Sequence, residues 1–217
     1  MGWELASATT YAVEGDTEDP RSWVGRVIQT EAPYEVNAAQ IGFFCSLVED
    51  PNPHYWHSER AASGRYGSII SPPGMLMVWM FPTPWHPDGR PEHGPLPGLE
   101  IPLPVDTLIN VATDTRFLEP MRVGDRLGYR HTITAVSAPK DTALGRGWFV
   151  TTMTETTDQH GVVVATNENV IFRYRATAPI GDDGRPARDD RPEGEPLPEI
   201  EMTVDASVAA LNAGATR

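Results

Sequence analysis

Four segments in the second half of the chain alternate apolar and polar residues, and this pattern restricts the fold more than any other. In DRLGYRHTITAVS the positions Leu127, Tyr129, His131, Ile133 and Ala135 recur with a period of two, the period of a β-strand. The other segments are TLINVATDTRFLEP, GWFVTTMTET and VVVATNENVIFRYRA, and the turn DQHG joins the last two. We therefore expect an antiparallel sheet, to which the earlier segment RVIQTEAPYEV adds a strand that turns at Pro33.

An apolar helix pattern lies between that first strand and the other four. Asn37 and Gln40 have the spacing of a capping box at a helix N-terminus. Apolar residues follow at i, i+3, i+4 and i+7: Ile41, Phe44, Cys45 and Val48. Because Phe43 and Leu47 widen this stripe, we expect the helix, from about Asn37 to Glu49, to be buried on most sides and enclosed by the sheet. One helix packed along a curved antiparallel sheet makes the predicted fold class α+β.

Composition excludes several classes of protein. The 217 residues carry a net charge of −13, which disfavours nucleic acid and anionic membranes as partners but leaves room for a local basic pocket. No apolar run approaches the ~20 residues of a membrane span, and the N-terminus lacks a signal-peptide pattern. The single cysteine, Cys45, cannot form an intrachain disulfide. These features predict a cytoplasmic protein.

The stretch VEDPNPHYWHSERA, from Val48 to Ala61, concentrates residues that can perform chemistry. Taken alone, its first part is typical of a helix end at which Asp50 and Asn52 satisfy backbone groups. His54 and His57 form an H-x-x-H pair, but two ligands without a third do not make a zinc site, so we expect no metal.

Several stretches together resemble the MaoC-like hydratases and dehydratases. These are DPNPHYWHSERA, SIISPPGML, RFLEPMRVGDRL and GRGWFVTTMTETTDQHGVVVA, and the resemblance covers roughly residues 20–177. It implies the hotdog fold, in which an antiparallel sheet wraps a long helix. It also implies hydration of enoyl thioesters, or dehydration of 3-hydroxyacyl thioesters, carried on coenzyme A or acyl carrier protein.

The resemblance assigns roles to individual residues and exposes one departure. The family pattern is Asp-x-Asn-Pro-x-His, in which the Asp and the His hold a water between them. Asp50 and Asn52 match, but Tyr55 occupies the position of the histidine. A phenol with a pKa near ~10 is a poor base at neutral pH. Gly74 matches the glycine whose N–H stabilises the thioester oxygen.

Whether His54 or His57 replaces the missing histidine stays open. The apolar run after Gly74 could line an acyl pocket or belong to the core, and the pocket candidates are Met75, Met77, Trp79 and Met80.

The Tyr variant resembles the substrate-binding subunits of heterodimeric MaoC-like enzymes, including steroid side-chain hydratases. We therefore expect a substrate-binding subunit of a heteromeric enoyl-CoA hydratase, paired with a second hotdog subunit that carries an intact Asp and His. No cofactor is expected beyond the thioester substrate. The alternatives are a self-sufficient homodimeric hydratase and a non-catalytic thioester-binding module. The expected domains are an acidic arm over residues 1–19, a hotdog domain over 20–177 and a Pro/Gly/charge-rich tail over 178–217.

Overall fold

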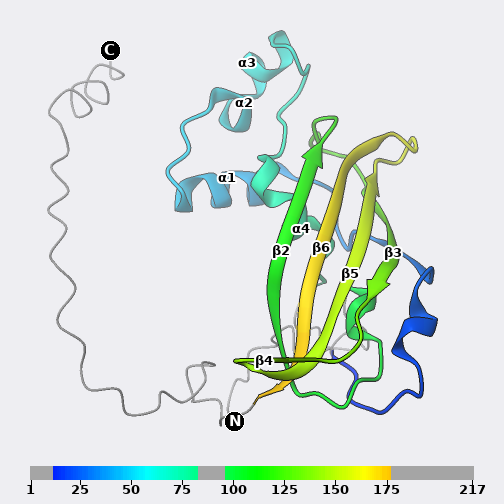
Figure 1. Cartoon of the computed structure of the whole chain (residues 1–217). Coiled ribbons are helices and arrows are strands. Elements are labelled where there is room, and N and C mark those ends of the chain that lie inside the picture. Colours follow the sequence, from blue (N-terminus) through cyan, green and yellow to red (C-terminus); the bar gives the residue numbers. More distant parts are fainter. Residues whose placement is uncertain (1–11, 83–95, 177–217) are drawn as a thin grey trace, which may run out of the picture. The chain divides into compact units, whose positions relative to one another are not determined.

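The computed structural model describes residues 12–82 and 96–176, in which six strands form one antiparallel sheet. The sheet order is β1-β3-β5-β6-β2, and β4 pairs with β5 (Figure 1). The strands are β1 (Val27–Glu31), β2 (Thr107–Phe117), β3 (Gly128–Val136), β4 (Lys140–Thr142), β5 (Gly145–Thr157) and β6 (Val163–Ala176). The five strands expected from the sequence are confirmed. The three-residue β4 was not expected, because it is too short to show a period of two.

Short helices occupy the connection between β1 and β2. They are α1 (Ala38–Leu47), α2 (Pro53–Trp56), α3 (Ser58–Ser63) and α4 (Leu76–Met80), with 3-10 turns η3 (Pro73–Met75) and η4 (Pro97–Leu99). A further 3-10 turn, η2 (Pro20–Trp23), precedes β1. Asn37 caps α1 as expected, since its Oδ1 accepts the N–H of Gln40 at 3.0 Å. No helix in residues 12–82 or 96–176 is long and apolar enough to cross a membrane.

The expected burial of α1 on most sides is wrong for the single chain. Ile41 and Cys45 are fully buried, whereas Phe43 is 68% exposed, Leu47 67% and Val48 55%. The helix is only ten residues long and packs against the rest of the fold along one face. Its outer apolar face has no cover among the described residues, so this surface needs an explanation beyond the single chain.

Two apolar clusters make up the core. The first joins the helices to the sheet, and among its buried residues are Ile41, Cys45, Trp79, Leu127 and Tyr129. The second joins the segment that leads into β2 to the sheet, and its buried residues are Leu99, Ile101, Leu103, Val105, Ile133, Val136, Val150 and Ile171. The alternating residues of this segment therefore cover part of the sheet that α1 does not reach.

The polar residue His131 lies on β3 between these two clusters. It is completely buried, and its ring nitrogens contact the hydroxyls of Thr154 at 2.9 Å and of Thr30 at 3.2 Å. Leu127, Tyr129, His131 and Ile133 are all buried, as the period of two predicts. The expectation that Ala135 shares this buried face is wrong. The register shifts after Ile133, so that Ala135 is exposed and Val136 is buried instead.

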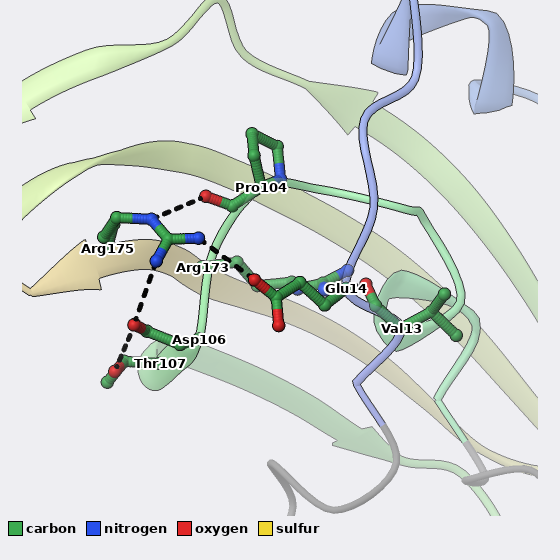
Figure 2. Close-up of polar contacts among 7 residues, drawn as sticks. All are labelled: Val13, Glu14, Pro104, Asp106, Thr107, Arg173 and Arg175. Carbon is green, nitrogen blue, oxygen red and sulfur yellow. Dashed lines mark hydrogen bonds and ion pairs between the residues drawn. The ribbon is translucent and has the colours of Figure 1, made fainter.

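A buried arginine on β6 fastens two other segments to the sheet. Arg173 is 1% exposed and donates to the carbonyl oxygens of Gly98, Leu99 and Ile101 through Nη1, and to that of Val13 through Nη2. Burial lowers the pKa of Arg173 to about 10, so the guanidinium stays charged at neutral pH. Arg175 lies two residues after Arg173 on β6. Its guanidinium donates hydrogen bonds to Pro104, Glu14 and Asp106 (Figure 2).

The described part of the N-terminal arm is therefore tied to the fold. Val13 donates its N–H to the carbonyl of Leu99, and Gly15 donates to that of Leu103. Residues 1–11 and 177–217 lie outside the described residues, so the expected boundaries of the arm, the hotdog domain and the tail stay predictions.

Candidate functional site

The backbone turns sharply at the end of α1, and this turn places Asp50. Glu49 adopts a left-handed conformation with φ 54°, and the N–H of Asp50 donates to the carbonyl of Cys45 at 2.9 Å. This six-to-one hydrogen bond closes a helix in the Schellman manner. A non-glycine residue in that conformation costs of order 1 kcal/mol, so the surrounding contacts have to hold it.

Three further hydrogen bonds fold the motif back on itself. The N–H of Asn52 donates to Oδ1 of Asp50 at 2.9 Å, and the N–H of His54 donates to Oδ1 of Asn52 at 3.1 Å. The indole of Trp56 donates to the carbonyl of Asp50 at 2.7 Å. Both side chains thus satisfy backbone groups, as the simpler interpretation of the sequence predicts. The other carboxylate oxygen of Asp50 takes no part in these bonds, and a role for it in proton transfer stays a prediction.

Tyr55 points its ring into the core next to this turn and is 9% exposed. Burial raises the pKa of the Tyr55 hydroxyl above its usual value, the negative charge of Asp50 raises it further, and a hydrogen bond with Asn52 acts in the opposite direction. The phenol is therefore neutral at physiological pH. It can donate a hydrogen bond, but it cannot serve as a general base there.

The two histidines of the motif lie in different surroundings. The ring of His54 packs edge-on against Tyr66 at 5.4 Å, and its Cε1 lies where a side chain at Gly64 would begin. His57 is exposed at the junction of α2 and α3. Among residues 12–82 and 96–176, no group of three His, Cys, Asp or Glu residues could hold a metal ion. His86 and His93 lie outside the described residues.

Gly74 is exposed in η3, directly before α4. As the second residue of this turn, it has one of the first N–H groups, which find no acceptor within a helix. A Cβ added at Gly74 would meet only the ring of Phe44, at 3.6 Å. The N–H therefore lies near the C-terminal half of α1, and its role as an oxyanion donor stays a prediction.

The apolar residues after Gly74 belong mainly to the core. Met75, Trp79 and Met80 are buried in the first cluster, and Met77 packs against it. The indole of Trp79 donates to the hydroxyl of Ser71 at 2.9 Å and also borders a cavity of about 300 Å³ with Tyr34 and Phe81. Contact of Met75, Met77, Trp79 and Met80 with a substrate stays a prediction.

A pocket of about 560 Å³ opens beside the motif. Its lining comes from α2, from the loop after α3 and from the segment that follows β2: Asn52, His54, Tyr55, Arg65, Tyr66, Ile70, Ser71, Pro73, Phe117, Leu118, Glu119, Pro120, Met121 and Arg122. Asn52, His54 and Tyr55 are thus brought to one pocket, whereas Asp50 and Gly74 do not line it. The sequence interpretation missed Arg65, Tyr66 and Arg122, because nothing in their local pattern shows that the fold joins the two segments.

A curved antiparallel sheet with helices against it is the hotdog fold of the MaoC-like hydratases and dehydratases. The family model described as "FAS1-like, dehydratase domain region" matches residues 22–167, more than half of the chain. The chain therefore belongs to this MaoC-like dehydratase family, as the resemblance in the sequence implied.

Named relatives and a solved structure agree with this assignment. The chain is 29% identical over 163 residues to a probable enoyl-CoA hydratase alpha subunit of Thermomonospora curvata, covering 71% of this chain and 50% of the relative. It is 31% identical over 122 residues to the 3-oxo-4,17-pregnadiene-20-carboxyl-CoA hydratase alpha subunit of Mycobacterium tuberculosis. This match covers 53% of this chain and 37% of the relative. It thus matches half or less of the length of these two relatives.

Among solved structures, the ChsH1-ChsH2 complex from Mycobacterium tuberculosis has a chain that aligns with a TM-score of 0.56 at 22% identity. The alignment covers 70% of this chain and 85% of that one. At this identity the likeness supports the fold alone.

Proposed function

We propose that this chain is the substrate-binding subunit of a heteromeric enoyl-CoA hydratase. The observation that carries the proposal is the neutral, buried Tyr55 at the position where the family has its catalytic histidine. Hydration needs a water held between two proton-transfer groups, and Asp50 with a phenol supplies only one effective base. His54 lines the same pocket as Tyr55, and the assay of the chain alone tests whether it replaces the missing base.

A second hotdog subunit with an intact Asp and His supplies the missing pair. Two surfaces support such a partner. The outer face of α1 exposes Phe43, Leu47 and Val48, and the edge strand β2 exposes Ile109 and Val111. An open strand edge with apolar side chains is a surface that natural proteins cover. Two relatives carry the name alpha subunit, which is consistent with assembly of this kind.

The substrate would be an enoyl thioester or, in the reverse direction, a 3-hydroxyacyl thioester. A bulky acyl group such as a steroid side chain is the finer form of this proposal, which the name of the Mycobacterium tuberculosis relative favours. The reaction we propose uses no cofactor besides the carrier of the thioester, and we place it in the cytoplasm.

The test is turnover of enoyl-CoA thioesters by the purified chain, alone and mixed with a hotdog partner that has the complete motif. Activity only in the mixture supports the proposal. Activity of the chain alone instead supports a self-sufficient homodimer. Thioester binding without turnover in either sample identifies a non-catalytic binding module.

A further inference from the structure

Two arginines flank Tyr66 at the pocket that Asn52 and Tyr55 line. The Nε of Arg122 donates to the main-chain carbonyl of Tyr66, and its Nη1 donates to that of Pro120, both at 3.4 Å. The guanidinium of Arg65 lies 5.6 Å from the centroid of the Tyr66 ring. These contacts hold both cations at one pocket, although residues 65 and 122 are far apart in the sequence.

Neither of these guanidinium groups has a carboxylate within 4 Å in the part of the chain that the structure describes. Arg26, Arg126, Arg146 and Arg175 each form an ion pair there, whereas Arg21, Arg60, Arg116 and Arg130 also form none. Arg65 and Arg122 differ from these four in lining one pocket together. A guanidinium has five N–H donors, so Arg122 keeps several after its two long bonds to carbonyls. Among the described residues, the lining of the pocket has one acidic side chain, that of the exposed Glu119, and the carboxylate of Asp125 outside the lining accepts the main-chain N–H of Arg122 at 2.6 Å.

The net charge of −13 makes this pair of cations significant. A strongly acidic protein repels phosphates in general, so it binds a phosphorylated ligand only where positive charge is concentrated. Guanidinium groups suit this task because their planar fork matches the oxygens of a phosphate. The pocket thus provides a concave space, two guanidinium cations and their hydrogen-bond donors.

The lining also indicates which part of a substrate the pocket takes. Arg65 belongs to the loop after α3 and Arg122 to the segment after β2, whereas Asn52 and Tyr55 of the motif line the same pocket from α2 and its start. A pantetheine arm separates the phosphate of a carrier from its thioester sulfur. The phosphate end therefore lies away from the reacting carbons, and the side of the pocket that the two arginines supply suits this phosphate end.

We propose that Arg65 and Arg122 form a subsite for the phosphate-bearing end of the pantetheine carrier. The inference rests on the proposed function, since it assumes a thioester substrate. The shared chemistry is a phosphate ester on a pantetheine arm, which free coenzyme A and the phosphopantetheine of an acyl carrier protein both contain.

The experiment measures binding to the full chain by calorimetry and requires no turnover. The probes are coenzyme A, dephospho-coenzyme A, 4′-phosphopantetheine and pantetheine, which has no phosphate. We expect coenzyme A to bind at least about tenfold more tightly than pantetheine, and Arg65→Gln and Arg122→Gln each to weaken its binding by about tenfold. Binding of pantetheine should not change in these variants. Arg146→Gln, which alters an exposed arginine paired with Asp141, is the matched control and should have no effect.

The probes also separate the two sources of the phosphate. Equal affinity for 4′-phosphopantetheine and coenzyme A supports a subsite for a single phosphate, which a carrier protein also provides. Weaker binding of 4′-phosphopantetheine supports a subsite for the diphosphate and nucleotide of coenzyme A. Equal binding of pantetheine and coenzyme A, no binding of coenzyme A, or unchanged affinity in both folded arginine variants would overturn the proposal. Because the probes carry no acyl group, a failed hydratase assay does not affect this result.

Discussion

The indole N–H of Trp56 donates to the main-chain carbonyl of Asp50 across 2.7 Å. The same indole lies beside Gly42 of α1, where an added Cβ would be 3.5 Å from its ring. Trp56 thus joins the helix, the left-handed turn at Glu49 and the start of α2. The orientation of Asp50 depends on this bond as well as on the turn itself.

Trp56→Phe keeps an aromatic ring beside Gly42 but removes the donor. We expect the free energy of unfolding to fall by about 1 kcal/mol, because the carbonyl of Asp50 loses a short hydrogen bond. Urea unfolding measures the change. A variant as stable as the parent would show that the bond contributes nothing and that the turn holds Asp50 by itself.

The N–H of Gly74 can be removed by substitution with proline, which has no N–H but adds three ring carbons. Gly74→Pro eliminates the donor, so turnover in the assembled enzyme should fall by about 10²-fold or more if this N–H stabilises the thioester oxygen. Gly74→Ala is the control, because it keeps the N–H and its Cβ would be in ordinary contact with Phe44. The kcat of both variants is compared after circular dichroism confirms that they fold. Equal activity of the two variants would exclude an oxyanion role for Gly74.

His131 makes the stability of the fold depend on pH. Burial lowers the pKa of His131 from 6.5 to about 4. Between these two values the unfolded chain binds a proton at His131 that the folded chain does not bind. The stability is therefore fully present above about pH 6.5 and is lost as the pH falls toward 4. The difference amounts to about 3 kcal/mol.

Unfolding free energies measured between pH 7.5 and 4 test this dependence. His131→Gln removes the titrating group and should flatten the curve in this range, at some cost in stability at pH 7.5. His160→Gln, at an exposed position in the turn between β5 and β6, should keep the slope of the parent. If His131→Gln shows the same slope as the parent, other groups cause the pH dependence.

Arg173 and Arg175 should differ strongly in their contributions to the stability of the fold, although both lie on β6. Arg173→Met removes this donor from the carbonyls of Gly98, Ile101 and Val13, while the carbonyl of Leu99 keeps the N–H of Val13. We expect a loss of about 3 kcal/mol or more. Arg175→Gln breaks exposed ion pairs and one exposed hydrogen bond to the carbonyl of Pro104, and it should cost less than about 1 kcal/mol. Thermal unfolding compares the two variants, and equal losses would contradict the role of the buried guanidinium.

The fold was predictable because its signals are local. The period of two in β3, β5 and β6 and the capping pair Asn37 and Gln40 each depend on residues that are close in sequence. The position of Ala135 was not predictable, because a register shift leaves no mark on the pattern. The exposure of Phe43 and Leu47 was also not predictable, since an apolar residue has the same identity whether its own chain or a partner covers it.

The candidate site was predictable only in part. Asp50, Asn52 and Tyr55 lie within one turn, so a motif could identify them together. Arg65 and Arg122 come to one pocket only through the pairing of distant segments, which no spacing rule contains. The local contacts of His54 likewise depend on the placement of Tyr66 and Gly64.

The most direct test of the central claim is the effect of Asp50→Asn on hydration of enoyl-CoA thioesters. If the chemistry belongs to a partner subunit, this chain alone has little activity, and Asp50→Asn changes the kcat of the assembled enzyme by no more than about threefold. A missing general base typically costs about 10²–10⁴-fold. Turnover of the chain alone at a few per second or more, abolished by Asp50→Asn, would contradict the account and identify a self-sufficient enzyme.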